Sequence, residues 1–110
     1  MRAEQLLSDG ELAAIEQRAA AATPGRWVAW LESRQATGGC SFIQLDADPD
    51  EDDELYLTRV TGGREIRGID ARTDADIDFI AAARQDVPRL LDEVRRLRAA
   101  LAQAQAQSTG

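Results

Sequence analysis

The feature that most constrains the fold is the spacing of apolar residues in the C-terminal third of this 110-residue chain. From residue 80 to residue 104 they recur at alternating steps of three and four, the heptad pattern of an α-helix with one buried seam. Such a seam predicts a helix that packs against another helix, but it names no substrate and no reaction. The seam residues are Ile80, Ala83, Val87, Leu90, Val94, Leu97, Leu101 and Ala104.

Pro88 lies inside this seam and predicts an interruption. Proline has no amide hydrogen and crowds the carbonyl four residues before it, which costs about 3 kcal/mol in a helix interior. Asp86 can cap a new helix and leave Pro88 in the first turn, where its missing donor does not matter. The sequence therefore predicts two C-terminal helices, about 74–85 and 87–105, with a break near Pro88 and with Thr73 capping the first.

The first two thirds of the chain predict one helix and a small sheet. Ser8 and Glu11 form a capping box that opens a helix running to about Ala22. Residues 61–64, Thr-Gly-Gly-Arg, fit a tight hairpin. Runs of β-preferring residues joined by short connections are typical of an antiparallel meander. The expected strands are 27–31, 41–45, 55–60 and 65–69, with a loop at 33–39.

These elements predict an α+β fold. It consists of an N-terminal helix, an antiparallel β-meander of 3–4 strands and two C-terminal helices. We expect residues 1–102 to form a single α+β domain with a C-terminal helical arm. Residues 103–110 lose the hydrophobic pattern, and we expect them to be a frayed tail.

The residue types that are missing exclude several classes of enzyme. The chain has no histidine, lysine or asparagine, and all 13 basic residues are arginine. Serine–histidine and cysteine–histidine catalysis, histidine-ligated metals, Schiff-base chemistry and a P-loop lysine are therefore excluded. Cys40 is the single cysteine, and we expect an unreactive thiol there. The sequence predicts no catalytic residue, no metal ligand and no cofactor.

The hydrophobic pattern also bears on location. No run of about 18 apolar residues is present, and charges are scattered through the first residues. We therefore expect a cytoplasmic protein without membrane contacts.

The net charge of −7 comes from one segment, residues 46–54, which carries seven acids and no base. The rest of the chain has 13 acidic and 13 basic residues and is neutral. The segment is interpreted as a solvated loop that discourages edge-to-edge association of sheets, or as a negatively charged contact for a basic partner. In the second interpretation the acids can mimic nucleic-acid phosphates. Direct nucleic-acid binding is electrostatically disfavoured. The acids are Asp46, Asp48, Asp50, Glu51, Asp52, Asp53 and Glu54.

A third interpretation of the acidic segment is a calcium site. Asp46, Asp48 and Asp50 reproduce the first three alternating ligands of an EF-hand loop. Two positions depart from that pattern, because Glu51 replaces the glycine of the sharp turn and Leu57 replaces the bidentate glutamate.

Trp27 and Trp30 are three residues apart and should point to opposite faces of a strand. One of them belongs to the core. The other either covers the second face of the sheet or is an exposed anchor for a partner, so Trp30 joins the acids as a candidate contact.

The helix after Pro88 is a candidate for self-association. Glu93 and Arg98 stand where ion pairs form between the helices of a parallel dimer. The alternative is packing within the chain against the stripe Leu12, Ile15 and Ala19 of the first helix. We expect a homodimer, with or without that intramolecular contact. The candidate self-association residues are Val87, Leu90, Leu91, Val94, Leu97 and Leu101.

Two blocks of the sequence carry a resemblance to a known group. The first is residues 11–18 (ELAAIEQR) leading into 22–27 (ATPGRW), and the second is residues 78–97 (DFIAAARQDVPRLLDEVRRL). Together they resemble small uncharacterised proteins of actinobacteria and their phages, similar to the Ead/Ea22-like group. This chain has Arg26 where that group typically has proline. The resemblance implies a phage or prophage accessory context and supplies no catalytic residues.

From these observations we expect a non-enzymatic accessory protein that acts as a protein-interaction module and self-associates through its C-terminal helix. The protein partner is unidentified. The alternatives are an acidic inhibitor, antitoxin or anti-defence protein that masks a basic nucleic-acid-binding partner, and a divalent-cation-binding protein.

Overall fold

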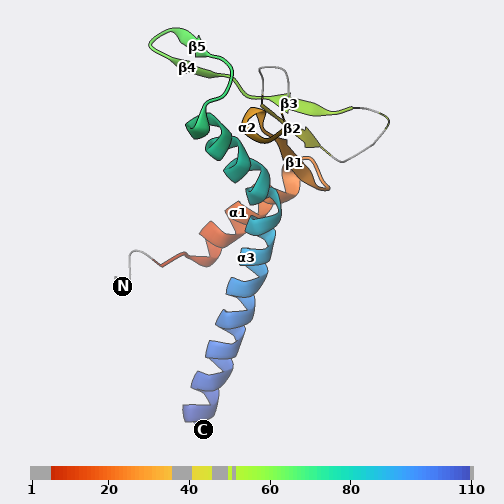
Figure 1. Cartoon of the computed structure of the whole chain (residues 1–110). Coiled ribbons are helices and arrows are strands. Elements are labelled where there is room, and N and C mark those ends of the chain that lie inside the picture. The colour runs from red at the N-terminus through yellow and green to blue at the C-terminus, as the bar shows by residue number, and fades with distance from the viewer. Residues whose placement is uncertain (1–5, 36–40, 46–49, 51, 110) are drawn as a thin grey trace. The chain divides into compact units, whose positions relative to one another are not determined.

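A computed structural model describes residues 6–35, 41–45, 50 and 52–109 and has the α+β architecture that the sequence predicts (Figure 1). The chain forms two compact units, one made of residues up to 22 with residues from 86 onward, the other of residues 23–85. The elements are α1 (Asp9–Ala21), β1 (Trp27–Trp30), α2 (Glu32–Gln35), β2 (Phe42–Leu45), β3 (Glu54–Tyr56), β4 (Arg59–Thr61), β5 (Arg64–Ile66) and α3 (Ala71–Thr109).

Helix α1 begins at the predicted capping box. The amide of Glu11 donates to Ser8 Oγ at 3.0 Å, and the amide of Ser8 donates to Glu11 Oε1 at 2.9 Å. Two amide groups that the first turn leaves without helical partners are thereby satisfied. The helix ends at Ala21, shortly before Pro24, which cannot continue the backbone ladder.

Strands β1, β2 and β3 form an antiparallel sheet in that order. Side chains alternate between its two faces, so Ile43 and Leu45 of β2 point to one face and Phe42 and Gln44 to the other. The first face carries the core of this unit. Its members are Leu31, Ile43, Leu45, Ile77 and Ala81, with Trp27 and Ala29 packed against them.

The sequence predicted a single β-meander, and the structure corrects this prediction, because the strands form two separate sheets. The strand expected at 55–60 divides at Leu57 and Thr58, and β4 pairs with β5 in a separate two-stranded sheet. Propensity did not show the division, because leucine and threonine suit a strand as well as a connection. The hairpin at 61–64 is confirmed, since Gly62 and Gly63 have φ of 58° and 78°, which this turn requires.

Helix α3 runs without interruption from Ala71 to Thr109, with Pro88 inside it (Figure 1). The predicted break near Pro88 is therefore wrong. Proline removes one hydrogen bond, whereas the helix is anchored by buried side chains on both sides of it, Ala81 before and Leu91 after. The end at Thr109 also lies beyond the expected end near residue 105.

The start of α3 differs from the prediction as well. The helix begins at Ala71, and the amide of Thr73 donates to Asp70 Oδ2 at 3.1 Å. Asp70, and not Thr73, is therefore the capping residue. Aspartate and threonine are similarly good N-caps, so residue type alone does not decide between them.

The buried stripe of α3 is displaced by one residue from the predicted seam. Ile77, Ala81 and Leu91 are buried, whereas Ile80 is 41% exposed and Leu90 is 62% exposed. Ile77, Ala81 and Leu91 are as apolar as the predicted seam residues and also follow helical spacing, so periodicity alone did not choose between them.

In the unit that contains α1, the helix α1 runs antiparallel to the end of α3. Arg95 Nη2 lies 3.3 Å from Glu16 Oε1, and Arg98 Nη1 lies 3.4 Å from Asp9 Oδ1. Residue numbers therefore rise along one helix as they fall along the other. Leu12 of α1 is buried in this unit. The intramolecular packing of the C-terminal helix against the first helix is thus present.

Among the residues that the structure describes, no helix is both long enough and apolar enough to cross a membrane.

Replacing Ile77 with alanine should lower the free energy of unfolding by about 2–5 kcal/mol, because it empties a buried site. The matched control is Ile80→Ala, on the same helix one turn later and largely exposed, which should cost about 1 kcal/mol or less. Urea unfolding followed by circular dichroism measures both. An equal loss in the two variants would contradict the burial described for α3.

Candidate functional site

Three aromatic side chains form a row across the outer face of the three-stranded sheet. Trp30 pairs in register with Phe42, and Phe42 pairs in register with Tyr56. The ring centroids are 6.3 Å apart for Trp30 and Phe42 and 4.9 Å apart for Phe42 and Tyr56, with interplanar angles of 13° and 25°. We call Trp30, Phe42 and Tyr56 the aromatic row.

The row lies on this face because the core occupies the other. Trp27 packs against the core, and its indole nitrogen donates to the Thr23 carbonyl at 3.0 Å. Trp30 points outward and donates to Gln44 Oε1 at 2.9 Å. The prediction that the two tryptophans lie on opposite faces is confirmed, and Trp30 and Tyr56 are 36% and 57% exposed.

Part of the acidic segment adjoins the aromatic row. Asp50, Asp52, Asp53 and Glu54 are exposed. Glu54 is opposite Gln44 in the register, so it lies on the same face as the row, and its carboxylate accepts a hydrogen bond from the Tyr56 hydroxyl at 3.2 Å. The structure therefore brings an acid of the segment next to the predicted Trp30 surface.

Several predicted residues lie outside the part of the chain that the structure describes. They are Asp46, Asp48 and Glu51 of the acidic segment, and Cys40. Within the described residues, no group of three or more aspartate, glutamate, histidine or cysteine side chains is placed to hold a metal ion. The calcium interpretation, which depends on Asp46 and Asp48, stays a prediction.

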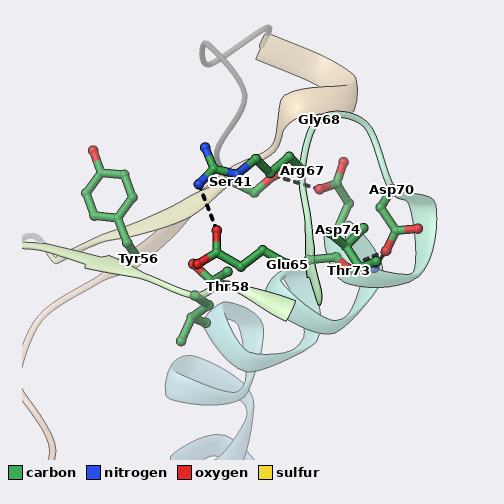
Figure 2. A pocket seen from close by; sticks show the side chains of 11 residues that line it. Ser41, Tyr56, Thr58, Glu65, Arg67, Gly68, Asp70, Thr73 and Asp74 are labelled. Atoms are coloured by element: carbon green, nitrogen blue, oxygen red, sulfur yellow. Dashed lines mark hydrogen bonds and ion pairs between the residues drawn. The ribbon is translucent and has the colours of Figure 1, made fainter. Parts of the chain in front are cut away.

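Beside Tyr56 there is a pocket of about 170 Å³ between β3, β5 and the start of α3 (Figure 2). None of its lining residues was a candidate from the sequence, because they come from segments that are distant in the chain. It is lined by Ser41, Tyr56, Leu57, Thr58, Glu65, Ile66, Arg67, Gly68, Asp70, Thr73 and Asp74.

One of the lining residues is a buried carboxylate, Asp74, which is 5% exposed. Asp74 Oδ1 accepts a hydrogen bond from the Ser41 hydroxyl at 2.7 Å, and Oδ2 accepts one from the amide of Ser33 at 3.1 Å. Ser41 Oγ in turn accepts from the amide of Glu32 at 2.9 Å. These side chains therefore cap α2, the short helix that replaces part of the loop expected at 33–39.

Two carboxylates of the pocket have lowered pKa values. Burial raises the pKa of Asp74, but hydrogen bonds from Ser33 and Ser41 outweigh it, so the pKa lies below its ordinary value. Hydrogen bonds from the side chain and amide of Thr73 lower the pKa of Asp70. Both groups are therefore ionised at neutral pH and accept hydrogen bonds rather than donate protons.

The remaining charges of the pocket are partly paired. Arg67 Nη2 lies 2.8 Å from Glu65 Oε2. Figure 2 marks this ion pair with a dashed line. Arg59 donates to Thr73 Oγ1 at 2.7 Å, pairs with Asp76, and has its Nε 3.7 Å from Asp70 Oδ2. The lining thus contains three carboxylates, Glu65, Asp70 and Asp74, and one guanidinium, that of Arg67.

The predicted self-association residues divide between two faces of α3. Leu91, Arg95 and Arg98 share the face that meets α1, and Arg98 donates to the Leu7 carbonyl at 2.6 Å. Glu93 pairs with Arg96 of the same helix, so both charges expected between chains have partners within this chain. Val87 and Val94 are half-buried. Leu90, Leu97 and Leu101 are exposed, and we call them the leucine face.

In comparisons with known proteins, no family model, no curated protein and no solved structure matches this chain.

The capping of α2 predicts a defined pH dependence. Because the pKa of Asp74 is lower in the folded than in the unfolded chain, its stabilisation is complete above the unfolded pKa and is lost as pH falls through the folded pKa. The excess stability of the wild type over Asp74→Asn should therefore shrink below about pH 4. Denaturant unfolding at a series of pH values measures it.

Carboxyl NMR titration gives an independent reading of the same network. Ser41→Ala removes a donor and should raise the pKa of Asp74, whereas Thr58→Ala removes a hydroxyl from the same pocket without touching Asp74. An unchanged pKa in Ser41→Ala would contradict the network.

Proposed function

We propose that this chain is a protein-interaction module that acts without catalysis, displays the aromatic row and its neighbouring acids to a protein partner, and self-associates through the leucine face. We place it in the phage or prophage accessory context that its sequence resemblance implies.

The observation that carries the proposal is the aromatic row. Three stacked aromatic side chains stand on the face of the sheet opposite the core. Trp30 and Tyr56 are exposed and Phe42 is half-buried between them. Large aromatic side chains that remain exposed mark binding surfaces, because they bury much area at low entropic cost when a partner covers them.

The neighbouring acids favour a basic partner. Glu54 lies on the same face as the row, and Asp52 and Asp53 precede it. Negative charge at the edge of an apolar contact steers a positively charged partner and repels nucleic acid. This supports the alternative that the chain masks a basic nucleic-acid-binding protein.

Partner capture from a bacterial lysate, measured by quantitative mass spectrometry, tests the display surface. A protein held by the wild type should be lost with Trp30→Ala, and also when Asp50, Asp52 and Asp53 become asparagine. Phe79→Ala is the matched control, because Phe79 is an exposed aromatic of the same unit on α3, away from the row. Equal capture by the wild type and by Trp30→Ala would show that the partner binds to another surface of the chain.

Self-association is supported by the leucine face. Leu90, Leu97 and Leu101 share one side of α3, at steps of seven and four, and are 53–62% exposed. The proposed occupant is a second copy of the chain, since burying these side chains removes apolar area from water.

The charges beside the leucine face suit an antiparallel second copy. Along this side Asp86, Arg89, Glu93 and Arg96 alternate in sign, and Asp86, Arg89 and Glu93 surround Leu90 in a shallow hollow. If two copies cross near residue 91 in opposite directions, Asp86 faces Arg96 and Arg89 faces Glu93 of the second copy. A parallel arrangement would set like charges opposite each other on this side.

Light scattering should give the wild type twice the 12.0 kDa mass of one chain. Leu97→Asp should give a monomer, because it places a charge in the proposed contact. Ala99→Asp adds the same charge on the opposite side of α3 and should remain a dimer. A monomeric wild type at concentrations of about 100 μM, which exceed the Kd of ordinary dimers, would remove self-association from the proposal.

A further inference from the structure

We infer that the pocket beside Tyr56 receives one arginine side chain of the protein partner. The inference rests on the proposed function, since it adds the chemistry of the partner to the display surface. The proposed binding site for this arginine is the cavity between β3, β5 and the start of α3, which is lined by residues outside the acidic segment.

The charge of the pocket selects a cation. Glu65, Asp70 and Asp74 contribute three negative charges to the lining and Arg67 one positive charge. Arg59 adds a second positive charge beside the pocket, because its Nε lies 3.7 Å from Asp70 Oδ2, so the balance of charge stays negative by one. Asp74 is buried and its hydrogen bonds hold it ionised, so its charge is weakly screened by solvent. A phosphate or carboxylate would meet this field with the same sign, whereas a guanidinium would be stabilised by it.

The size of the pocket suits a side chain and not a larger ligand. Small-molecule sites typically enclose about 300–1,000 Å³, and this pocket is about 170 Å³. A cavity of roughly 150 Å³ holds a ligand of six heavy atoms such as benzene. The guanidinium and the adjacent methylene of one arginine are of that order.

The wall of the pocket at Tyr56 favours a planar cation. Tyr56 lines the pocket, ends the aromatic row on β3 and is 57% exposed. A guanidinium stacks on an aromatic face and at the same time presents its donors in its own plane, where a carboxylate such as Glu65 can accept them. Lysine supplies the charge without the stacking plane or the paired donors.

The chain already contains a guanidinium at this site. Arg67 bonds to Glu65 at 2.8 Å, and both side chains are more than half exposed, so the pair is weak and open to exchange (Figure 2). An incoming arginine competes with Arg67 for Glu65. Because of this competition, removing Arg67 should strengthen the binding of a cation. In an anion-binding site, removing Arg67 would weaken binding instead.

The test is an NMR titration of the isotope-labelled full chain with an eight-residue peptide of alternating arginine and glycine. Amide signals of Tyr56, Thr58 and Gly68 should shift, and a peptide with glutamine in place of arginine should bind about tenfold more weakly or not at all. Arg67→Gln should tighten binding about threefold, and Glu65→Gln should weaken it by a similar factor.

Glu16→Gln, in the other unit, is the matched control. It changes the net charge by the same amount as Glu65→Gln and should leave the Kd within about twofold. Weaker binding in Arg67→Gln, displacement of the peptide by inorganic phosphate, or equal effects of the two glutamate variants would overturn the inference. Single-stranded oligonucleotide binding at the same amides, without peptide binding, would overturn it as well.

The outcomes separate the inference from the proposed function. If a partner is captured in a Trp30-dependent manner and the arginine peptide leaves the pocket amides unchanged, the interaction module stands and the arginine pocket fails. If the peptide binds in the pocket and Trp30→Ala captures the same proteins as the wild type, the display surface fails and the pocket stands.

Discussion

The sheet-containing unit depends on the hydrogen bonds of one buried carboxylate, Asp74. A buried charge is tolerated only when its oxygens are paired, and here the donors are the hydroxyl of Ser41 and the amide of Ser33. These bonds hold the start of α2 and Ser41 against the first turn of α3. Ile77 and Ala81 follow Asp74 at steps of three and four, so the same side of α3 that is anchored by the carboxylate also packs on the sheet.

The surface features follow from this arrangement. With one face of the sheet covered by α3, the alternation of side chains leaves Trp30, Phe42 and Tyr56 on the other face, where their rings stack. Asp74 and Ser41 also line the pocket beside Tyr56. The network that stabilises the fold therefore supplies the negative charge to which we assign the partner's arginine.

Three predictions that depended on neighbours in sequence were confirmed. The capping box at Ser8, the hairpin at Gly62 and Gly63 and the opposite faces of the two tryptophans need only local geometry. The predicted break at Pro88 was wrong because buried contacts on both sides of the proline outweigh one missing hydrogen bond. The aromatic row was only partly foreseen: Trp30 was a candidate, whereas Phe42 and Tyr56 needed the strand register.

The sequence by itself determined the α+β class, the start of α1, the concentration of negative charge in residues 46–54 and the exclusion of histidine- and lysine-dependent chemistry. These properties follow from composition and from spacing within single elements. Only the tertiary structure decided which side of α3 is buried, how the strands divide into two sheets and which residues line the pocket. The reason is physical: each of these outcomes depends on contacts between residues far apart in the chain, such as Ser41 and Asp74, and no local pattern records such contacts.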